Sequence, residues 1–403
     1  MSVADASSTQ SEFKAPVSSG RKKWGWSGLL FFGVLVLIGY VWWPPDRVAL
    51  PPSLSLAAYE EARLDYIDLF HREPSEADLM IMIAESAVRN EQRDVAVDCF
   101  KRIPSAHMRY GASARLQEAQ VLLRNNDAEK AEASFRAFLS LAERQPALSP
   151  EHVRLAREWL VFILAVELRM EDRKEILQTM IRDGQFDVYD AKQYYFPTLL
   201  IWQSALGSSR LRDFLQQAPD SRVLQVARAR YLVAEGNLDE ANDLLASLRK
   251  RHPADPVLIA ASLECFYEQV DWEQFKKLLS ASPAFQDGEP WLLTQMRAQY
   301  ALQTKDWPNA EKYLREVLKR DPANPTCHMG LAKAFHGQGK VSERRRCQER
   351  SRILAQIRVG LSAASNESAK AATALAEDAR DLGMSDAAET FECLAKRIES
   401  GIP

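Results

Sequence analysis

The sequence predicts an all-α protein, a solenoid of helix-turn-helix repeats preceded by one N-terminal transmembrane helix. Residues 24–43 form an uncharged apolar run, and helical periodicity broken by short turns fills the chain from Leu56 onward. A pattern of small residues, turns and prolines also returns at intervals of about 34 residues, which is typical of repeat architectures. The 403 residues are enough for one elongated repeat domain.

The apolar run Trp24–Trp43 reads WGWSGLLFFGVLVLIGYVWW. A helix of this length reaches roughly 30 Å, the thickness of the hydrocarbon core of a bilayer. Aromatic residues at both ends match the interfacial belts of membrane helices, and Pro44 and Pro45 end the helix. A cleaved signal peptide is disfavoured because no small-residue cleavage site follows. The length disfavours a buried core helix.

The charges beside this run predict its orientation. Only Arg47 follows the run closely, whereas four basic residues precede it: Lys14, Arg21, Lys22 and Lys23. The positive-inside rule therefore makes residues 1–23 a disordered cytoplasmic tail. The predicted localisation is that of a single-pass membrane protein whose solenoid is periplasmic. The reverse orientation, with the solenoid in the cytosol, stays open.

The stretch YLVAEGNLDEANDLLASLRKRHPADP begins at Tyr231, and a similar stretch, YALQTKDWPNAEKYLREVLKRDPANP, begins at Tyr300. Small residues recur where neighbouring helices must approach closely: Ala229, Ala241, Ala298, Ala310 and Ala332. These residues and the turns between them resemble the tetratricopeptide repeat, a helix-turn-helix unit of about 34 residues. The resemblance implies a right-handed superhelix with a concave groove lined by the first helix of each unit.

The repeat pattern divides the rest of the chain. Residues 150–220 depart from this pattern, because Leu164 and Ile176 occupy positions where small residues are expected. The predicted parts are a Pro-rich linker at 44–55, a leading helix at 56–76, tetratricopeptide-like repeats at 77–149, divergent helical repeats at 150–220, further repeats at 221–358 and a C-terminal capping repeat at 359–403.

No motif predicts catalysis. The sequence has no HExxH, GxGxxG or GxSxG, and its five cysteines lack metal-site spacing. His328 and His336 lie eight positions apart, which on a helix is about 12 Å and too far for one metal ion. We therefore predict no catalytic residue, cofactor or metal. An enzyme is possible only if residues 150–220 hide a site.

Repeat register places candidate partner-binding residues in the groove. The set is Arg230, Glu264, Tyr267, Gln295, Gln299, Lys333 and His336. This mixed polar and apolar lining suits a peptide segment. The clamp that binds the C-terminal carboxylates of heat-shock chaperones in this family is not supported. The positions where its lysines would be hold Val226, Ala260, Gln295 and Met329.

Basic residues gather between Lys333 and Arg358, eight against two acidic. The candidate patch is Arg344, Arg345, Arg346, Arg350 and Arg352. It is either a solvated helix surface or a docking site for an acidic partner or anionic lipid headgroups. Nucleic-acid binding is disfavoured because aromatic residues are not interleaved with the basic ones.

Together these patterns predict a non-enzymatic scaffold, anchored to a membrane through Trp24–Trp43, that binds protein partners through peptide segments. The alternatives are a cytosol-facing docking receptor and, less favoured, an enzyme. The number of subunits has no signature in the sequence.

Overall fold

Helices make up all the regular structure in the part of the chain that the computed structural model describes. Those residues are 50–144, 148–195, 204–363, 368–381, 383 and 385–401. The first half contains α2 (Leu56–Phe70), α3 (Glu76–Arg89), α4 (Arg93–Arg102), α5 (Gly111–Arg124), α6 (Ala128–Ala142), α7 (Pro150–Val166), α8 (Met170–Arg182), α9 (Val188–Tyr195) and α10 (Ser204–Gln217). The second half contains α11 (Arg222–Ala234), α12 (Leu238–Arg251), α13 (Pro256–Glu268), α14 (Trp272–Ala281), α15 (Trp291–Gln303), α16 (Trp307–Arg320), α17 (Pro325–Gly337), α18 (Val341–Ala363), α19 (Ala369–Asp381) and α20 (Ser385–Ser400).

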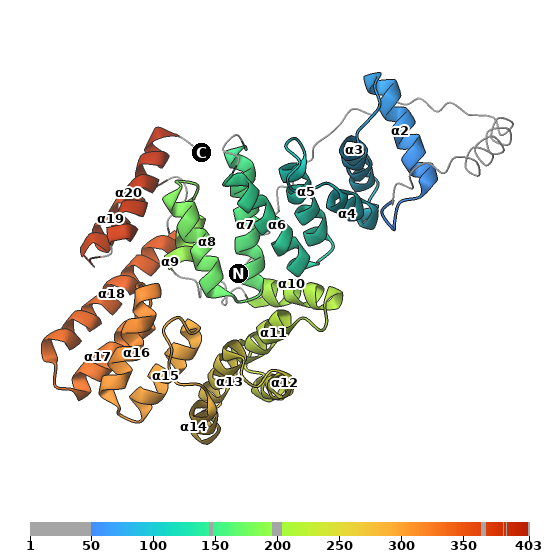
Figure 1. Ribbon diagram of the computed structural model, residues 1–403. Coiled ribbons are helices and arrows are strands. Elements are labelled where there is room, and N and C mark those ends of the chain that lie inside the picture. The colour runs from blue at the N-terminus through green and yellow to red at the C-terminus, as the bar shows by residue number, and fades with distance from the viewer. Residues whose placement is uncertain are drawn as a thin grey trace, which may run out of the picture. The chain divides into compact units, whose positions relative to one another are not determined.

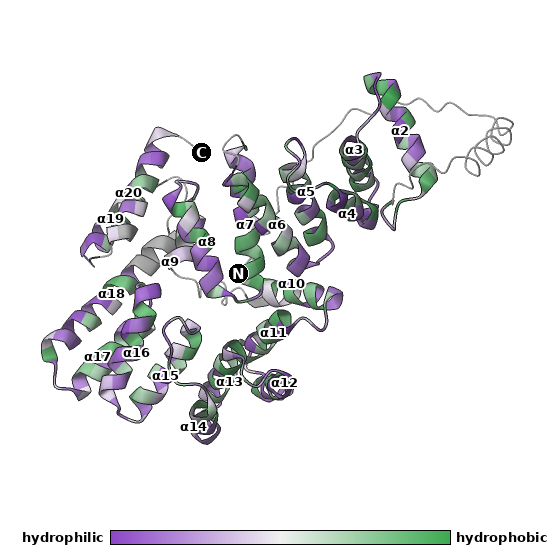
Figure 2. Ribbon diagram, in the orientation of Figure 1, coloured by the Kyte–Doolittle hydropathy of each residue, from purple (hydrophilic) through white to green (hydrophobic). Residues whose placement is uncertain are grey.

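Consecutive helices pack in antiparallel pairs, each with hydrophobic and hydrophilic faces (Figures 1 and 2). The alanines of the repeat pattern lie where the helices touch. Ala229, Ala241, Ala298 and Ala310 have no exposed surface, and Ala332 is 3% exposed. A larger side chain there would push the helices apart. The prediction of an all-α helical repeat is therefore confirmed.

The turn inside most pairs contains one residue in the left-handed conformation. Gly236 and Gly339 adopt it as expected, with φ of 82° and 74°. Leu168 and Val270 adopt it as well, with φ of 55° and 59°, although such side chains disfavour it. The same turn geometry thus recurs even where the sequence does not favour it.

The divergent segment returns to pack against helices far along the chain. Lys174 Nζ lies 2.8 Å from Asp321 Oδ1, and Arg320 Nη1 lies 3.2 Å from Glu171 Oε2. We call these two ion pairs the return contact. Leu177 and Met180 from α8 also share one apolar core with Phe391 and other residues of α19 and α20.

This second interface accounts for the departure from the repeat pattern in residues 150–220. Leu164 is fully buried, and Ile176 packs against the core shared with the C-terminal helices. Large side chains suit these positions because the segment contacts more than its sequence neighbours. Residues 51–403 form one unit by their contacts.

The predicted localisation must be corrected. Among the residues described, no helix is both long enough and apolar enough to cross a bilayer. The predicted span Trp24–Trp43 and the tail 1–23 lie outside those residues. A single-pass membrane protein is therefore not supported, and the repeats are considered below without an anchor.

Candidate functional site

The groove cavity lies between the turn that joins α7 to α8 and the first helices α11, α13 and α15. Its volume is about 480 Å³. Its apolar wall is formed by Val223, Val226, Val257, Ala260, Trp291 and Leu292. Its charged lining is formed by Glu129, Glu132, Glu167, Glu171, Asp172, Arg169, Arg222 and Arg230. Acidic groups therefore outnumber basic ones five to three.

Arg230 joins the turn to the first helices. Its guanidinium donates to both carboxylate oxygens of Glu264, over 2.7 and 3.1 Å, and to the carbonyl oxygen of Leu168 over 3.1 Å. Repeat register placed Arg230 and Glu264 on one face, and the structure brings them together. Leu168 was not identified from the sequence, although it is the residue held in the left-handed conformation.

The basic groups of the groove cavity are already paired. Arg169 contacts Glu132, Glu167 and Asp172 over 2.5 to 3.0 Å. Arg222 is paired with Asp255. Glu129, by contrast, is exposed and makes no ion pair among the residues described. Its carboxylate remains available to a ligand.

Glu167 lies deep in this network and is 5% exposed. Burial raises its pKa to about 7, against the opposing influence of Arg169. The charge of the groove cavity therefore changes near neutral pH.

The other predicted groove residues do not line this cavity. Gln295 and Gln299 are half-buried on α15, while Lys333 and His336 are exposed on α17. Tyr267 packs edge-on against Trp272 with ring centroids 5.7 Å apart. His336 Nδ1 lies 3.1 Å from Arg344 Nη1, which connects the predicted groove set to the predicted basic patch.

Two residues of the basic patch line a second cavity. This basic cavity has a volume of about 650 Å³ and lies among α8, α9, α16, α17, α18 and the turn before α20. Arg346 and Arg350 border it, whereas Arg344, Arg345 and Arg352 do not. Arg352 instead contacts Glu349 at 2.6 Å.

The return contact separates the two cavities. Glu171 lines the groove cavity, and Lys174, one helical turn later, lines the basic cavity. Nothing in the sequence indicated that α8 meets α16, because their paired residues are 147 and 149 positions apart.

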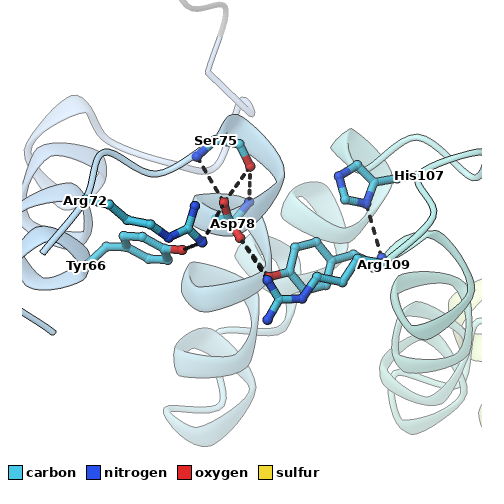
Figure 3. Close-up of polar contacts among 7 residues, drawn as sticks. Tyr66, Arg72, Ser75, Asp78, His107 and Arg109 are labelled. Carbon is cyan, nitrogen blue, oxygen red and sulfur yellow. Dashed lines mark hydrogen bonds and ion pairs between the residues drawn. The ribbon is translucent and has the colours of Figure 1, made fainter. Parts of the chain in front are cut away.

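A third polar cluster surrounds Asp78 on α3 (Figure 3). Its Oδ1 accepts from the Tyr110 hydroxyl at 2.7 Å, and its Oδ2 accepts from the Ser75 nitrogen at 3.1 Å and hydroxyl at 2.7 Å. Burial alone would raise the pKa of Asp78, but the hydrogen bonds from Tyr110 and Ser75 lower it to about 2. The carboxylate is fully occupied in joining α3 to the start of α5, so we interpret the cluster as structural.

Among the residues described, no group of three or more metal-ligating side chains converges. His328 is buried and its Nε2 lies 3.0 Å from the Pro322 carbonyl oxygen, whereas His336 is exposed. The two histidines therefore occupy different surroundings.

The family model described as tetratricopeptide repeat matches residues 81–148 and 296–343. No curated protein matches the sequence significantly. Among solved structures, a tetratricopeptide repeat protein from Parabacteroides merdae is 12% identical, covering 64% of this chain and 99% of its own, with a TM-score of 0.33. The APC/C hetero-tetramer Cut9-Hcn1 is 14% identical over 85% of this chain and 78% of that chain, with a TM-score of 0.36. The human IFIT1 dimer with m7Gppp-AAAA is 14% identical over 85% and 87%, with a TM-score of 0.25. At these scores the three structures carry no argument about what this chain binds.

Proposed function

We propose that the chain binds a peptide segment of a partner in the groove cavity. The chain is a member of the tetratricopeptide repeat family, whose members are generally non-enzymatic scaffolds for protein–protein interaction. The cavity combines an apolar wall with convergent polar groups, as peptide-binding sites do.

The proposal rests on the negative charge of the groove cavity, which lies beside its apolar wall. Its three arginines are paired within the chain, while Glu129 is free and acidic groups are in excess. Electrostatic complementarity then favours a segment in which a basic side chain lies beside apolar ones. The apolar residues would cover Val257, which is 43% exposed.

Panning a random peptide display library on the full chain tests this proposal. We expect the enriched peptides to share a Lys or Arg next to apolar residues. Val257→Lys should weaken their binding at least tenfold, because it places a charge in the apolar wall that also repels a basic side chain, without disturbing a buried position.

Val341→Lys is the matched control, since Val341 also lies in the first turn of a helix, is 51% exposed and lies outside the cavity. Binding should also strengthen as the pH rises from 6 to 8, because the pKa of Glu167 is about 7 and its ionised form attracts a basic segment. Enrichment that Val257→Lys leaves unchanged would show that the partner segment binds elsewhere.

A further inference from the structure

The basic cavity is a separate candidate site with the opposite charge. Its walls include five cationic side chains and one carboxylate: Lys174, Arg315, Lys319, Arg346, Arg350 and Glu343. A cavity of about 650 Å³ is in the size range of sites that enclose small ligands or short segments. The excess of positive charge predicts an anionic ligand.

The cationic side chains differ in what already neutralises them. Lys174 is paired with Asp321 at 2.8 Å, Arg315 with Glu311 at 2.8 Å and Lys319 with Glu316 at 2.5 Å. Arg346 and Arg350 are exposed, and neither forms an ion pair within the described part of the chain. These two guanidinium groups are therefore the ones available to a ligand.

The two free arginines lie four positions apart, so both project from one side of α18. Like charges at this spacing destabilise a helix, and an anion between them removes the repulsion. Guanidinium groups bind carboxylates in a fixed, bidentate geometry, which gives such a site specificity as well as affinity.

Apolar side chains also line the cavity. Leu331, Phe335 and Leu354 are 2 to 4% exposed, whereas Leu318 is half-buried and offers apolar surface beside the two free arginines. A small inorganic anion would leave this surface uncovered, whereas a segment with an apolar side chain next to its carboxylate would bury it.

We propose that the basic cavity binds an acidic segment of a partner polypeptide, with a Glu or Asp carboxylate between Arg346 and Arg350. An adjacent apolar side chain packs against the exposed part of Leu318. The site lies mainly on α16, α17 and α18, and no residue of the predicted groove set lines it. It does not depend on the groove cavity being occupied.

The test is fluorescence anisotropy of the full chain with a labelled decapeptide that alternates Glu with Leu, and with its Gln–Leu counterpart. We expect the Glu peptide to bind at least tenfold more tightly. The double variant Arg346→Gln/Arg350→Gln should remove that preference while leaving the melting temperature unchanged, because both side chains are exposed.

Arg352→Gln is the matched control, since Arg352 is on the same helix but outside the cavity. Equal binding of the two peptides, or full binding by the double variant, would overturn the proposal. Inorganic phosphate that binds alone with the same dependence on Arg346 and Arg350 would also overturn it, by showing a site for small anions. Val257→Lys tests the groove cavity separately and should leave the binding of the Glu peptide unchanged.

Discussion

Breaking the return contact should destabilise two distant parts of the chain together. Lys174 and Asp321 are 8% and 4% exposed, so both charges are nearly removed from water. Among the residues described, Asp321→Ala would leave the Lys174 ammonium with the rings of Tyr194 and Trp291, whose centroids lie 5.0 and 5.9 Å from Nζ. An ammonium buried without a carboxylate is the costly state.

Removing one partner of a buried pair costs about 3 to 5 kcal/mol. The two cation–π contacts offset about 1 kcal/mol of this. We therefore expect Asp321→Ala to lower the free energy of unfolding by about 3 kcal/mol. Lys174→Met should cost less, because the other Asp321 oxygen keeps its hydrogen bond from Asn324 at 3.1 Å.

The double variant Lys174→Met/Asp321→Leu should cost much less than the sum of the single variants, since it leaves no unpaired charge. We expect a coupling of about 2 kcal/mol, measured by urea unfolding. Repeat arrays can unfold in parts, so amide hydrogen exchange should be followed in both α8 and α16.

Lys319 and Glu316 provide the control cycle. They are 2.5 Å apart, but the lysine side chain is 72% exposed. Their coupling should stay below about 0.5 kcal/mol, as for most surface pairs. The reasoning would be refuted by a Lys174–Asp321 coupling no larger than that of the control, or by exchange that accelerates in only one of the two helices.

Three further predictions concern single positions. Gly111→Ala would bring its Cβ to 2.2 Å from the Ser105 carbonyl oxygen, so calorimetry should show a loss of about 2 kcal/mol, against less than 0.5 kcal/mol for the exposed Ser113→Ala. Val270→Gly relieves a β-branched residue at φ 59° and should raise the free energy of unfolding by about 1 kcal/mol; any loss would show that the turn is not strained. Glu167→Gln should leave the free energy of unfolding nearly unchanged at pH 4 but raise it at pH 8 by up to about 3 kcal/mol. The reason is that folding raises the pKa of the Glu167 carboxyl from 4.5 to about 7, so its ionisation above pH 4.5 favours the unfolded state, and glutamine does not ionise. Denaturant titrations at the two pH values decide this last prediction, which fails if the variant gains nothing at pH 8.

The parts of the fold that depend on neighbouring repeats could be predicted from sequence. Ala241 and Ala310 mark close helix contacts, and both are fully buried. Register also places Arg230 above Glu264, which lies 34 positions later, one repeat on. These features follow from a periodic pattern, so a single sequence is enough to reveal them.

The candidate sites could be predicted only in part. Arg346 and Arg350 were found from charge, but Lys174 and the cavity that they share were not. The return contact leaves no periodic pattern in the sequence, because it joins residues of repeats that are not neighbours along the chain. Leu168 also carried no signal, since neither its residue type nor its neighbours favour a positive φ.

The return contact also changes how the array should respond to force. Stacked repeats that contact only their neighbours extend gradually under force, because each interface between neighbouring repeats opens slightly. Here the return contact, together with the apolar core that α8 shares with α19 and α20, joins distant parts of the array, so a pull on the ends first loads these contacts. The helices between α8 and α16 are thereby protected from the applied force. We expect extension to begin with abrupt rupture of these contacts instead of gradual stretching of the whole array.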